Sequence, residues 1–250
     1  AGTGLGREVA LELLRRGANV VAIDINESFL SETVALAGAD AQRLSTSRLD
    51  ISDRNAVIEF SAHHNDLDGL VNVAGIIQPF VRVEQLQSEQ IDRVMYVNFF
   101  GPLNLIHAFL PTLKSRPTAH ILNVSSMGSY APVPGQTIYG ASKAALNLLT
   151  EGLRSELSET NVKLTLVWPG AIGTNIAGNS GIAMPAGSAA DAPAMKMVAP
   201  ADAGKAMVDA MASDKKRIYI GQDAKLLGRI AQFSTDMLSL IHISEPTRPY

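Results

Sequence analysis

The sequence predicts one α/β domain in which a doubly wound parallel sheet lies between two layers of helices. A chain of 250 residues with 46% hydrophobic residues is long enough to bury one large core. Short apolar runs alternate with longer segments of helical periodicity along most of the chain. Because strands that alternate with helices are joined by crossovers, this order predicts parallel strands with helices on both faces.

The first predicted elements are a helix over residues 5–16 and a strand over 19–25. Leu5, Val9 and Leu13 share one face of the helix, and Gly17 follows it as a stop signal. The run NVVAIDI is almost wholly apolar, which is typical of a strand buried on both faces. The same patterns predict strands near 43–49, 69–74, 119–124, 162–168 and 217–220, and helices near 27–37, 53–64, 84–112, 137–159, 200–212 and 223–235.

The stretch 175–199 lacks this alternation and is rich in Ala, Gly and Ser. A connection of this length in a compact domain is usually a lid or a binding loop. Its large apolar residues predict an adaptable, apolar lid; they are Ile176, Ile182, Met184, Met195 and Met197. Lipid-like, steroid-like or acyl substrates fit this composition, and so does a small diol.

Composition excludes several classes of function. A net charge of −3 gives no basic field for nucleic acid or an anionic membrane. The absence of cysteine excludes disulfides, thiolate catalysis and cysteine–zinc sites, and it suits a cytoplasmic location. The histidines show no ligand spacing, so we expect no metal, and no apolar run is long enough to span a bilayer.

A glycine-rich segment, Gly2-Thr3-Gly4-Leu5-Gly6, leads into the first helix. Such a turn lets a pyrophosphate approach the free N–H groups and the positive end of the helix dipole, although glycine-rich turns also occur without ligands. Asp24 ends the following strand, where a carboxylate can accept both hydroxyls of an adenosine ribose; a plain turn residue is the alternative. Asp24 would repel a 2′-phosphate, and neither Thr3 nor Ile25 supplies a cation. We therefore predict NAD(H), with NADP(H) less favoured.

Three further residues form a candidate proton-transfer site. Tyr139 and Lys143 lie one turn apart on a predicted helix, where an ammonium would favour the phenolate of a group that ordinarily titrates near pH 10. Ser126 follows a predicted strand, at the sheet edge where α/β proteins bind ligands. Its hydroxyl could hold a substrate oxygen near the phenol. Lys143 could also hold the hydroxyls of the nicotinamide ribose, so we expect Tyr139 and Lys143 to belong to the cofactor site as well. Alternatively, the tyrosine and lysine could belong to a solvated helix surface and Ser126 could merely end a strand.

Together these residues resemble the short-chain dehydrogenases/reductases, which have a Rossmann-type fold, over most of residues 1–235. Further segments that resemble the family are Leu49-Asp50-Ile51 at the adenine, Asn72-Val73-Ala74-Gly75, Val97-Asn98-Phe99-Phe100-Gly101, and Pro169-Gly170-Ala171-Ile172-Gly173-Thr174 beside the nicotinamide. The resemblance implies that Asn98 is a fourth catalytic residue, which fixes a water that passes a proton from Lys143. Val73 departs from the family's asparagine, and only Gly4 and Gly6 match its three glycines.

The resemblance implies an oxidoreductase that transfers a hydride between NAD(H) and a secondary alcohol or ketone. It also implies a homotetramer or homodimer packed through the helices near 84–112 and 137–159. A regulatory nucleotide-binding protein that performs no chemistry is one alternative. The other is an incomplete, inactive fragment of the enzyme.

We expect residues 1–237 to form the single domain. The family's first strand would precede Ala1, so we expect a sheet without its central strand, weak folding and weak NAD binding. Residues 238–248 can be back-translated into a string that resembles a sequencing-library adapter, so we interpret about residues 238–250 as a non-native tail. An ordinary C-terminal segment is the alternative.

Overall fold

A computed structural model describes residues 1–183 and 197–233 of the chain. The predicted lid residues Met184 and Met195 and the tail 238–250 lie outside the described residues.

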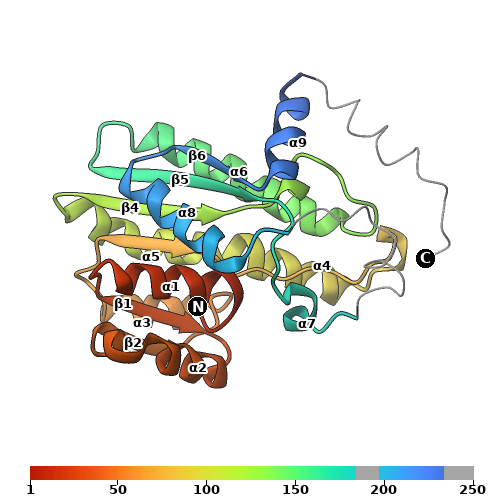
Figure 1. Ribbon diagram of the computed structural model, residues 1–250. Helices are drawn as coiled ribbons and strands as arrows, with labels where there is room; N and C mark the ends of the chain where they lie inside the picture. Colours follow the sequence, from red (N-terminus) through yellow and green to blue (C-terminus); the bar gives the residue numbers. More distant parts are fainter. Residues whose placement is uncertain (184–196, 234–250) are drawn as a thin grey trace.

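The strands of the described residues all pair in parallel, as predicted, but they form two sheets (Figure 1). The smaller sheet pairs β1 (Val20–Asp24) with β2 (Leu44–Arg48). The larger sheet has the order β3-β4-β5-β6, with β3 at Gly69–Asn72, β4 at Ala119–Val124, β5 at Val162–Pro169 and β6 at Arg217–Ile220. Within the described residues no strand joins β1 to β3, so the expected sheet is divided at this point.

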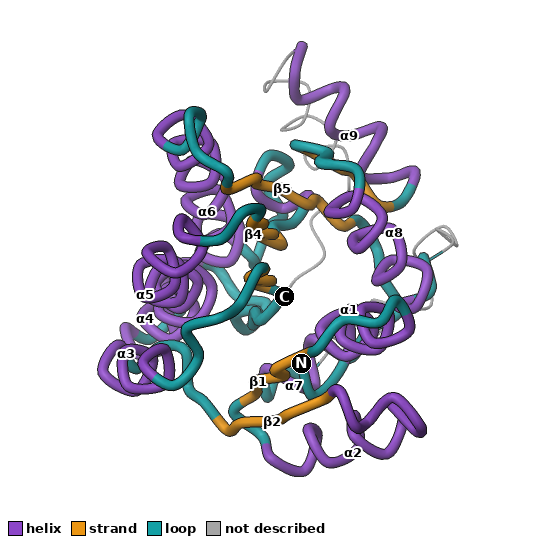
Figure 2. The backbone as a smooth tube through the Cα atoms, turned by 90° about the vertical axis from the view of Figure 1, so that its left-hand side faces the viewer, coloured by secondary structure: helices purple, strands orange, loops and turns teal. Residues whose placement is uncertain are grey.

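Helices cover both faces of the strand layer, which gives the predicted three layers (Figure 2). One face carries α3 (Arg54–Ala62), α4 (Ser88–Met95), α5 (Gly101–Ser115) and α6 (Thr137–Glu156). The other carries α1 (Gly4–Arg15), α2 (Glu27–Ala37), α8 (Pro200–Ala212) and α9 (Gln222–Phe233). The doubly wound α/β architecture is therefore confirmed.

The core explains why β4 reads as an apolar run. All of its residues are buried, because it lies inside the larger sheet with helices on both sides. Ile121 packs with Phe109 and Leu113 of α5 on one face, and Leu122 packs with Val9 of α1 and other apolar residues on the opposite face. These two clusters fix the ends of the strands, where the candidate site residues lie.

The single helix predicted near 84–112 is wrong in detail. A short 3-10 turn occupies Val83–Gln85, α4 begins at Ser88, and a π-helical turn over Tyr96–Phe100 separates α4 from α5. Pro102 supplies the reason: it has no amide hydrogen, so it cannot donate the usual helical bond to the carbonyl of Asn98. Single π-helical turns of this kind are frequent at functional sites.

The region predicted as a structureless loop also contains regular structure. A short helix, α7, occupies Ile176–Ser180 and is capped by the side chain of Asn175, which accepts from the amide of Gly178. Ile172 and Val198 form an isolated parallel bridge that closes the loop at its base. The other elements begin and end within about three residues of their predicted bounds, as is usual for helix and strand ends.

Candidate active site

The predicted proton-transfer residues come together where β4 meets α6. Ser126 follows β4 and its Oγ accepts from the amide of Gly128 (3.1 Å), while Tyr139 and Lys143 lie in the first turns of α6. Burial raises the pKa of the Tyr139 phenol, and a hydrogen bond with the Ser126 side chain works in the opposite direction. Ser126 and Tyr139 are thus neighbours, as the sequence predicts.

Lys143 is almost fully buried, with 3% of its surface exposed. Its Nζ donates to the carbonyl of Val124 at 3.0 Å. Burial lowers the pKa of Lys143 to about 8, because a charged ammonium is poorly solvated there. Within the described residues no hydrogen bond joins Lys143 to Tyr139, and the lysine is not among the causes of the phenol's pKa shift. The expected effect of the ammonium on the phenol is therefore not seen in this arrangement.

Asn98 is fully buried in the π-helical turn and reaches both neighbouring segments. Its Oδ1 accepts from the amide of Ile76 (2.8 Å), and its Nδ2 donates to the carbonyl of Ile76 (2.9 Å) and to Oγ of Ser142 (3.0 Å). The side chain thus holds the turn after β3 against α6. Both N–H groups of Nδ2 are used in these bonds, and the main-chain carbonyl of Asn98 cannot accept the usual helical bond from residue 102, which is proline.

Gly75 allows this turn to approach the lysine closely. A Cβ at Gly75 would lie 3.1 Å from Nζ of Lys143 and 3.4 Å from Oδ1 of Asn98. Asn72, in the preceding strand, donates to Oδ1 of Asn123 (2.8 Å) and so ties β3 to β4. Ala74 lies between them and is exposed.

The start of α1 lies at the same edge of the strand layer and has the features of an anion site. Thr3 makes no side-chain cap, and the first turn contains no acidic residue. Gly4 has a φ of +55°, and a Cβ there would lie 3.5 Å from the methyl carbon of Thr174. A Cβ at Gly6 would lie 3.8 Å from Cβ of Val73. The glycine segment, the turn after β3 and the segment after β5 therefore meet.

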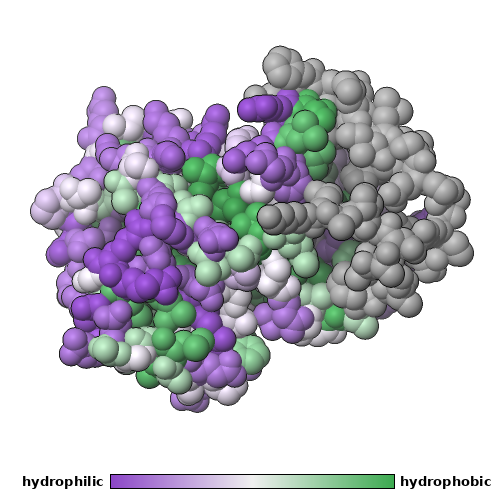
Figure 3. All heavy atoms as spheres, in the orientation of Figure 1, coloured by the Kyte–Doolittle hydropathy of each residue, from purple (hydrophilic) through white to green (hydrophobic). Residues whose placement is uncertain are grey.

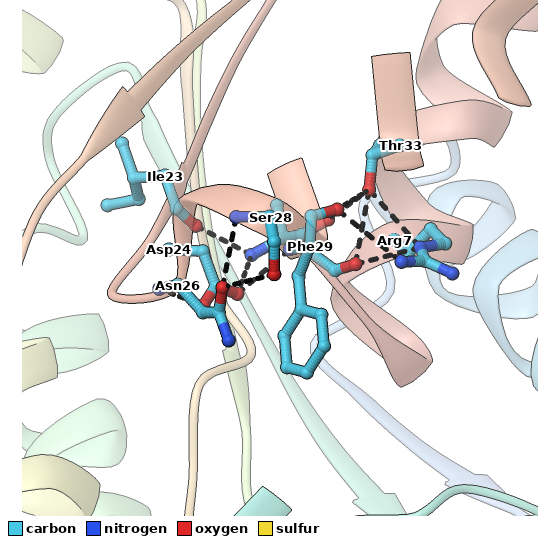
Figure 4. A network of polar contacts seen from close by, with 9 residues as sticks. Arg7, Ile23, Asp24, Asn26, Ser28, Phe29 and Thr33 are labelled. Atoms are coloured by element: carbon cyan, nitrogen blue, oxygen red, sulfur yellow. Dashed lines mark hydrogen bonds and ion pairs between the residues drawn. The ribbon is translucent and has the colours of Figure 1, made fainter. Parts of the chain in front are cut away.

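Asp24 is the centre of a polar network beside this helix start (Figure 4). Its Oδ2 accepts from the amide of Gly2 (2.8 Å) and from the amino group of Ala1 (3.1 Å), and its Oδ1 accepts from the amide of Asn26 (3.0 Å). Burial alone would raise the pKa of Asp24, but the charge of the Ala1 amino group and the amides of Asn26 and Gly2 hold it below its ordinary value. The carboxylate is therefore ionised and aimed at the glycine segment.

The remaining predicted cofactor residues frame the same region. Asp50 is exposed and its Oδ1 accepts from the amide and the hydroxyl of Ser52 (2.9 and 2.6 Å). Ile51 is buried against Gly101. The preceding residue, Leu49, donates its amide to the carbonyl of Asp24 (3.0 Å), which places these residues beside the predicted ribose site.

The segment from Pro169 to Thr174 is fixed by backbone bonds. The amide of Gly170 donates to the carbonyl of Ile220 (2.8 Å). The amide of Val198 donates to the carbonyl of Ala171 (3.0 Å), and Val198 also forms the isolated bridge with Ile172. Sequence analysis missed Asp223, whose Oδ2 accepts from the amide of Ala171 (2.6 Å). Sequence analysis also missed Gln78 and Arg48, because neither residue belongs to a motif that can be recognised by its spacing.

These observations fit a dinucleotide. Free helix amides, a glycine at positive φ and an ionised carboxylate at the end of the neighbouring strand are what a pyrophosphate and an adenosine ribose require. A metal site has no comparable support, because the described residues hold no cluster of three or more His, Asp or Glu side chains suited to an ion. Among the described helices none combines the length and apolar character that a membrane span needs.

Comparison with known proteins agrees with this geometry. A family model described as short chain dehydrogenase matches residues 1–184. "Probable oxidoreductase EphD" of Mycobacterium tuberculosis is 42% identical over 190 residues, which cover 74% of this chain and 32% of that protein. The match thus spans about a third of the length of EphD. SadH of the same organism, also named as an oxidoreductase, is 33% identical over 242 residues, which cover 93% of this chain and 87% of SadH.

Solved structures extend the likeness to the whole fold. A short-chain dehydrogenase of Burkholderia cenocepacia J2315 in complex with NADP superposes with a TM-score of 0.81 at 30% identity, covering 98% of this chain and 95% of that one. A short-chain dehydrogenase/reductase of Burkholderia phymatum in complex with NAD gives a TM-score of 0.82 at 23% identity, covering 100% and 95%, and shares the fold.

Proposed function

Because this chain belongs to the short-chain dehydrogenase family, we propose that it transfers a hydride between NAD(H) and a secondary alcohol or ketone. One observation carries the proposal: the turn at Gly75 lies against Lys143 and Asn98, and Lys143 shares the start of α6 with Tyr139, which neighbours Ser126. A catalytically silent binding protein would not require a buried lysine one helical turn from a half-buried tyrosine at this place.

A bound dinucleotide would accept or supply the hydride at its nicotinamide ring. Ser126 would hold the substrate oxygen, and Tyr139 would give its proton to that oxygen in reduction or remove it in oxidation. Gly2 to Gly6 would bind the pyrophosphate, Asp24 the ribose, Asp50 and Ile51 the adenine, and the 169–174 segment the nicotinamide side.

Lys143 is suited to relay the proton onward. A pKa of about 8 means that it can release and regain a proton near neutral pH. Asn98 lies close by, and its carbonyl cannot receive a helical bond from Pro102. We therefore retain the proposal that Asn98 fixes a water for this relay, through its main chain.

Cofactor preference rests on Asp24, which favours the unphosphorylated ribose of NAD(H). The competing observation is Arg48, which pairs with Asp24 across β1 and β2 and donates from Nε to the carbonyl of Ile25 (3.2 Å). A guanidinium at this place could receive a 2′-phosphate, and the Burkholderia cenocepacia relative binds NADP. NAD(H) remains our proposal because the carboxylate is the group that faces the glycine segment.

We propose an apolar substrate, copies of the chain packed together, and a cytoplasmic location. Figure 3 shows hydrophobic residues gathered in the middle of one face. Met197 of the predicted lid is 63% exposed. Leu148 on α6 (77% exposed) and Tyr96 before α5 (51% exposed) are apolar surface that a second copy could cover.

The decisive test replaces the tyrosine. Tyr139→Phe should reduce NADH-linked turnover on a panel of alcohols and ketones by roughly 100- to 10,000-fold, the usual contribution of a general acid. NADH binding, followed by its fluorescence, should stay within about twofold, because the lost hydroxyl serves the substrate. Tyr219→Phe, which removes a phenol from β6, is the matched control. Equal turnover in both variants would refute the catalytic assignment.

The two alternatives predict different results in the same experiment. A silent regulatory protein would bind NADH tightly and show no turnover with any substrate. An incomplete, inactive fragment would show weak NADH binding and a broad thermal transition, whereas a cooperative melt with tight binding would exclude it.

A further inference from the structure

Gln78 is a fully buried polar residue to which the proposed chemistry gives no role. It lies just after β3, and its Oε1 accepts hydrogen bonds from the amides of Ile138 (2.7 Å) and Tyr139 (3.1 Å). One side-chain oxygen from a distant segment therefore binds the backbone of the proposed catalytic residue.

This contact replaces the missing cap of α6. The first amides of a helix have no partner within the helix and are ordinarily bound by the residue that precedes it. Here that residue, Gln136, makes no capping bond and instead donates from Nε2 to the carbonyl of Gln78 (2.8 Å). The start of α6 is thus capped from outside.

The segment that supplies the cap also contacts two of the other proposed catalytic residues, Asn98 and Lys143. Ile76 exchanges hydrogen bonds with the side chain of Asn98, and Gly75 lies against Nζ of Lys143. The amide of Ile77 donates to Oγ of Ser180 in α7 (3.0 Å). Residues 75–78 therefore connect the lysine, the asparagine and the helix that carries the tyrosine.

We propose that Gln78 is a positioning residue, which fixes the main chain of Tyr139 and thereby sets the phenol relative to Lys143 and Ser126. This inference rests on the proposed function. It assigns Gln78 no contact with substrate or cofactor, so its removal should impair the chemical step and leave binding intact.

The amide orientation of Gln78 makes the proposal testable with two substitutions. Oε1 must face the two amide donors, and within the described residues Nε2 has no hydrogen-bond partner. Replacing this nitrogen with oxygen, as in Gln78→Glu, therefore breaks no bond and keeps the cap. Gln78→Met keeps the length of the side chain and removes the acceptor.

The first experiment measures kcat and KM for Gln78→Met. We expect kcat to fall roughly 10- to 100-fold, the effect of misplacing a catalytic group by about an ångström, while both KM values change less than about threefold. Asn161→Ala is the control for lost stability, because Asn161 donates to the carbonyls of Leu113 and Arg116 near the opposite ends of the strands. A kcat for Gln78→Met that falls no further than that of the control would overturn the proposal.

The second experiment follows the pH dependence of Gln78→Glu. The cap is retained, so kcat should recover at alkaline pH toward the wild-type value. The added carboxylate disfavours the phenolate, so the limb of the kcat profile that reports Tyr139 should shift to higher pH. If Gln78 only stabilised the fold, Gln78→Met and Gln78→Glu would change the melting temperature and leave kcat close to the wild-type value, which would count against the inference.

A third measurement separates failure of this inference from failure of the proposed function. Tyrosine labelled with ¹³C at Cζ reports the titration of each phenol by NMR, and Tyr139→Phe identifies the signal of Tyr139. If the wild type shows no turnover, the proposed function fails, yet Gln78→Glu must still raise the pKa of Tyr139. If turnover is normal and that pKa is unchanged, only the role of Gln78 is refuted.

Discussion

Lys143→Met tests whether the proposed site is maintained at the expense of stability. Burial lowers the pKa of Lys143 from 10.5 to about 8, so the protonated lysine is less stable in the folded chain than in the unfolded chain. At about 1.36 kcal/mol per pKa unit, this destabilises the folded chain by about 3 kcal/mol at pH 7. Methionine would remove that cost and lose the bond to Val124, which is worth about 1 kcal/mol.

The expected net gain is therefore about 2 kcal/mol at pH 7, together with loss of turnover. The gain has a defined pH dependence. Below pH 8 the lysine is protonated in both the folded and the unfolded chain, so the full destabilisation by the buried ammonium is present. Between about pH 8 and 10.5 only the unfolded chain binds the proton, so wild-type stability rises and the advantage of the variant disappears.

Urea denaturation of both proteins at pH 7, 8, 9 and 10 measures this difference directly. Lys163→Met, on an exposed position of β5, is the matched control and should show no such dependence. A difference between wild type and Lys143→Met that stays constant from pH 7 to pH 10 would refute the reasoning from burial.

Three further predictions concern the cofactor site, the turn at Gly75 and the cap of α3. Asp24→Ser should weaken NADH binding roughly 10-fold, with a smaller loss for NADPH, whereas Arg48→Ala should weaken only NADPH; fluorescence titration distinguishes them, and an unchanged NADH/NADPH ratio in Asp24→Ser contradicts our proposed preference. Gly75→Ala should lower kcat, because its Cβ would press on Nζ of Lys143 at 3.1 Å, and steady-state kinetics that match wild type would show that the turn can yield. Asp53→Ala removes bonds to the amides of Asn55 and Ala56 at the start of α3 and should cost about 1 kcal/mol of unfolding free energy without altering kcat.

Local patterns were sufficient to predict most of the fold. The fully buried β4 reads as an apolar run because both faces meet helices, and the helix over 5–16 follows from its apolar stripe. The π-helical turn before α5 could also have been predicted, since Pro102 cannot donate the usual helical bond to the carbonyl of residue 98. The division of the strands into two sheets follows from no local pattern, although the expectation of a missing central strand concerns the same position.

The sequence predicted those residues of the candidate site that are related by a regular spacing along the chain. Tyr139 and Lys143 are joined by helical periodicity, and Asp24 and Gly4 by the order of strand and helix. Gln78, Asp223 and Arg48 act through contacts between segments far apart in the chain, for which spacing gives no signal. The partner of Lys143 could not be predicted either, because Val124 binds it through a main-chain carbonyl.

The division between β1 and β3 has a consequence for local opening. In the part of the chain that the structure describes, each of these strands pairs on one side only, whereas β4 and β5 pair on both. Amides that point toward the division should exchange with deuterium sooner than those of β4, because local separation there breaks no ladder. A short extended peptide that pairs in parallel with both β1 and β3 would slow that exchange. It would lie beside the glycines that we assign to the pyrophosphate.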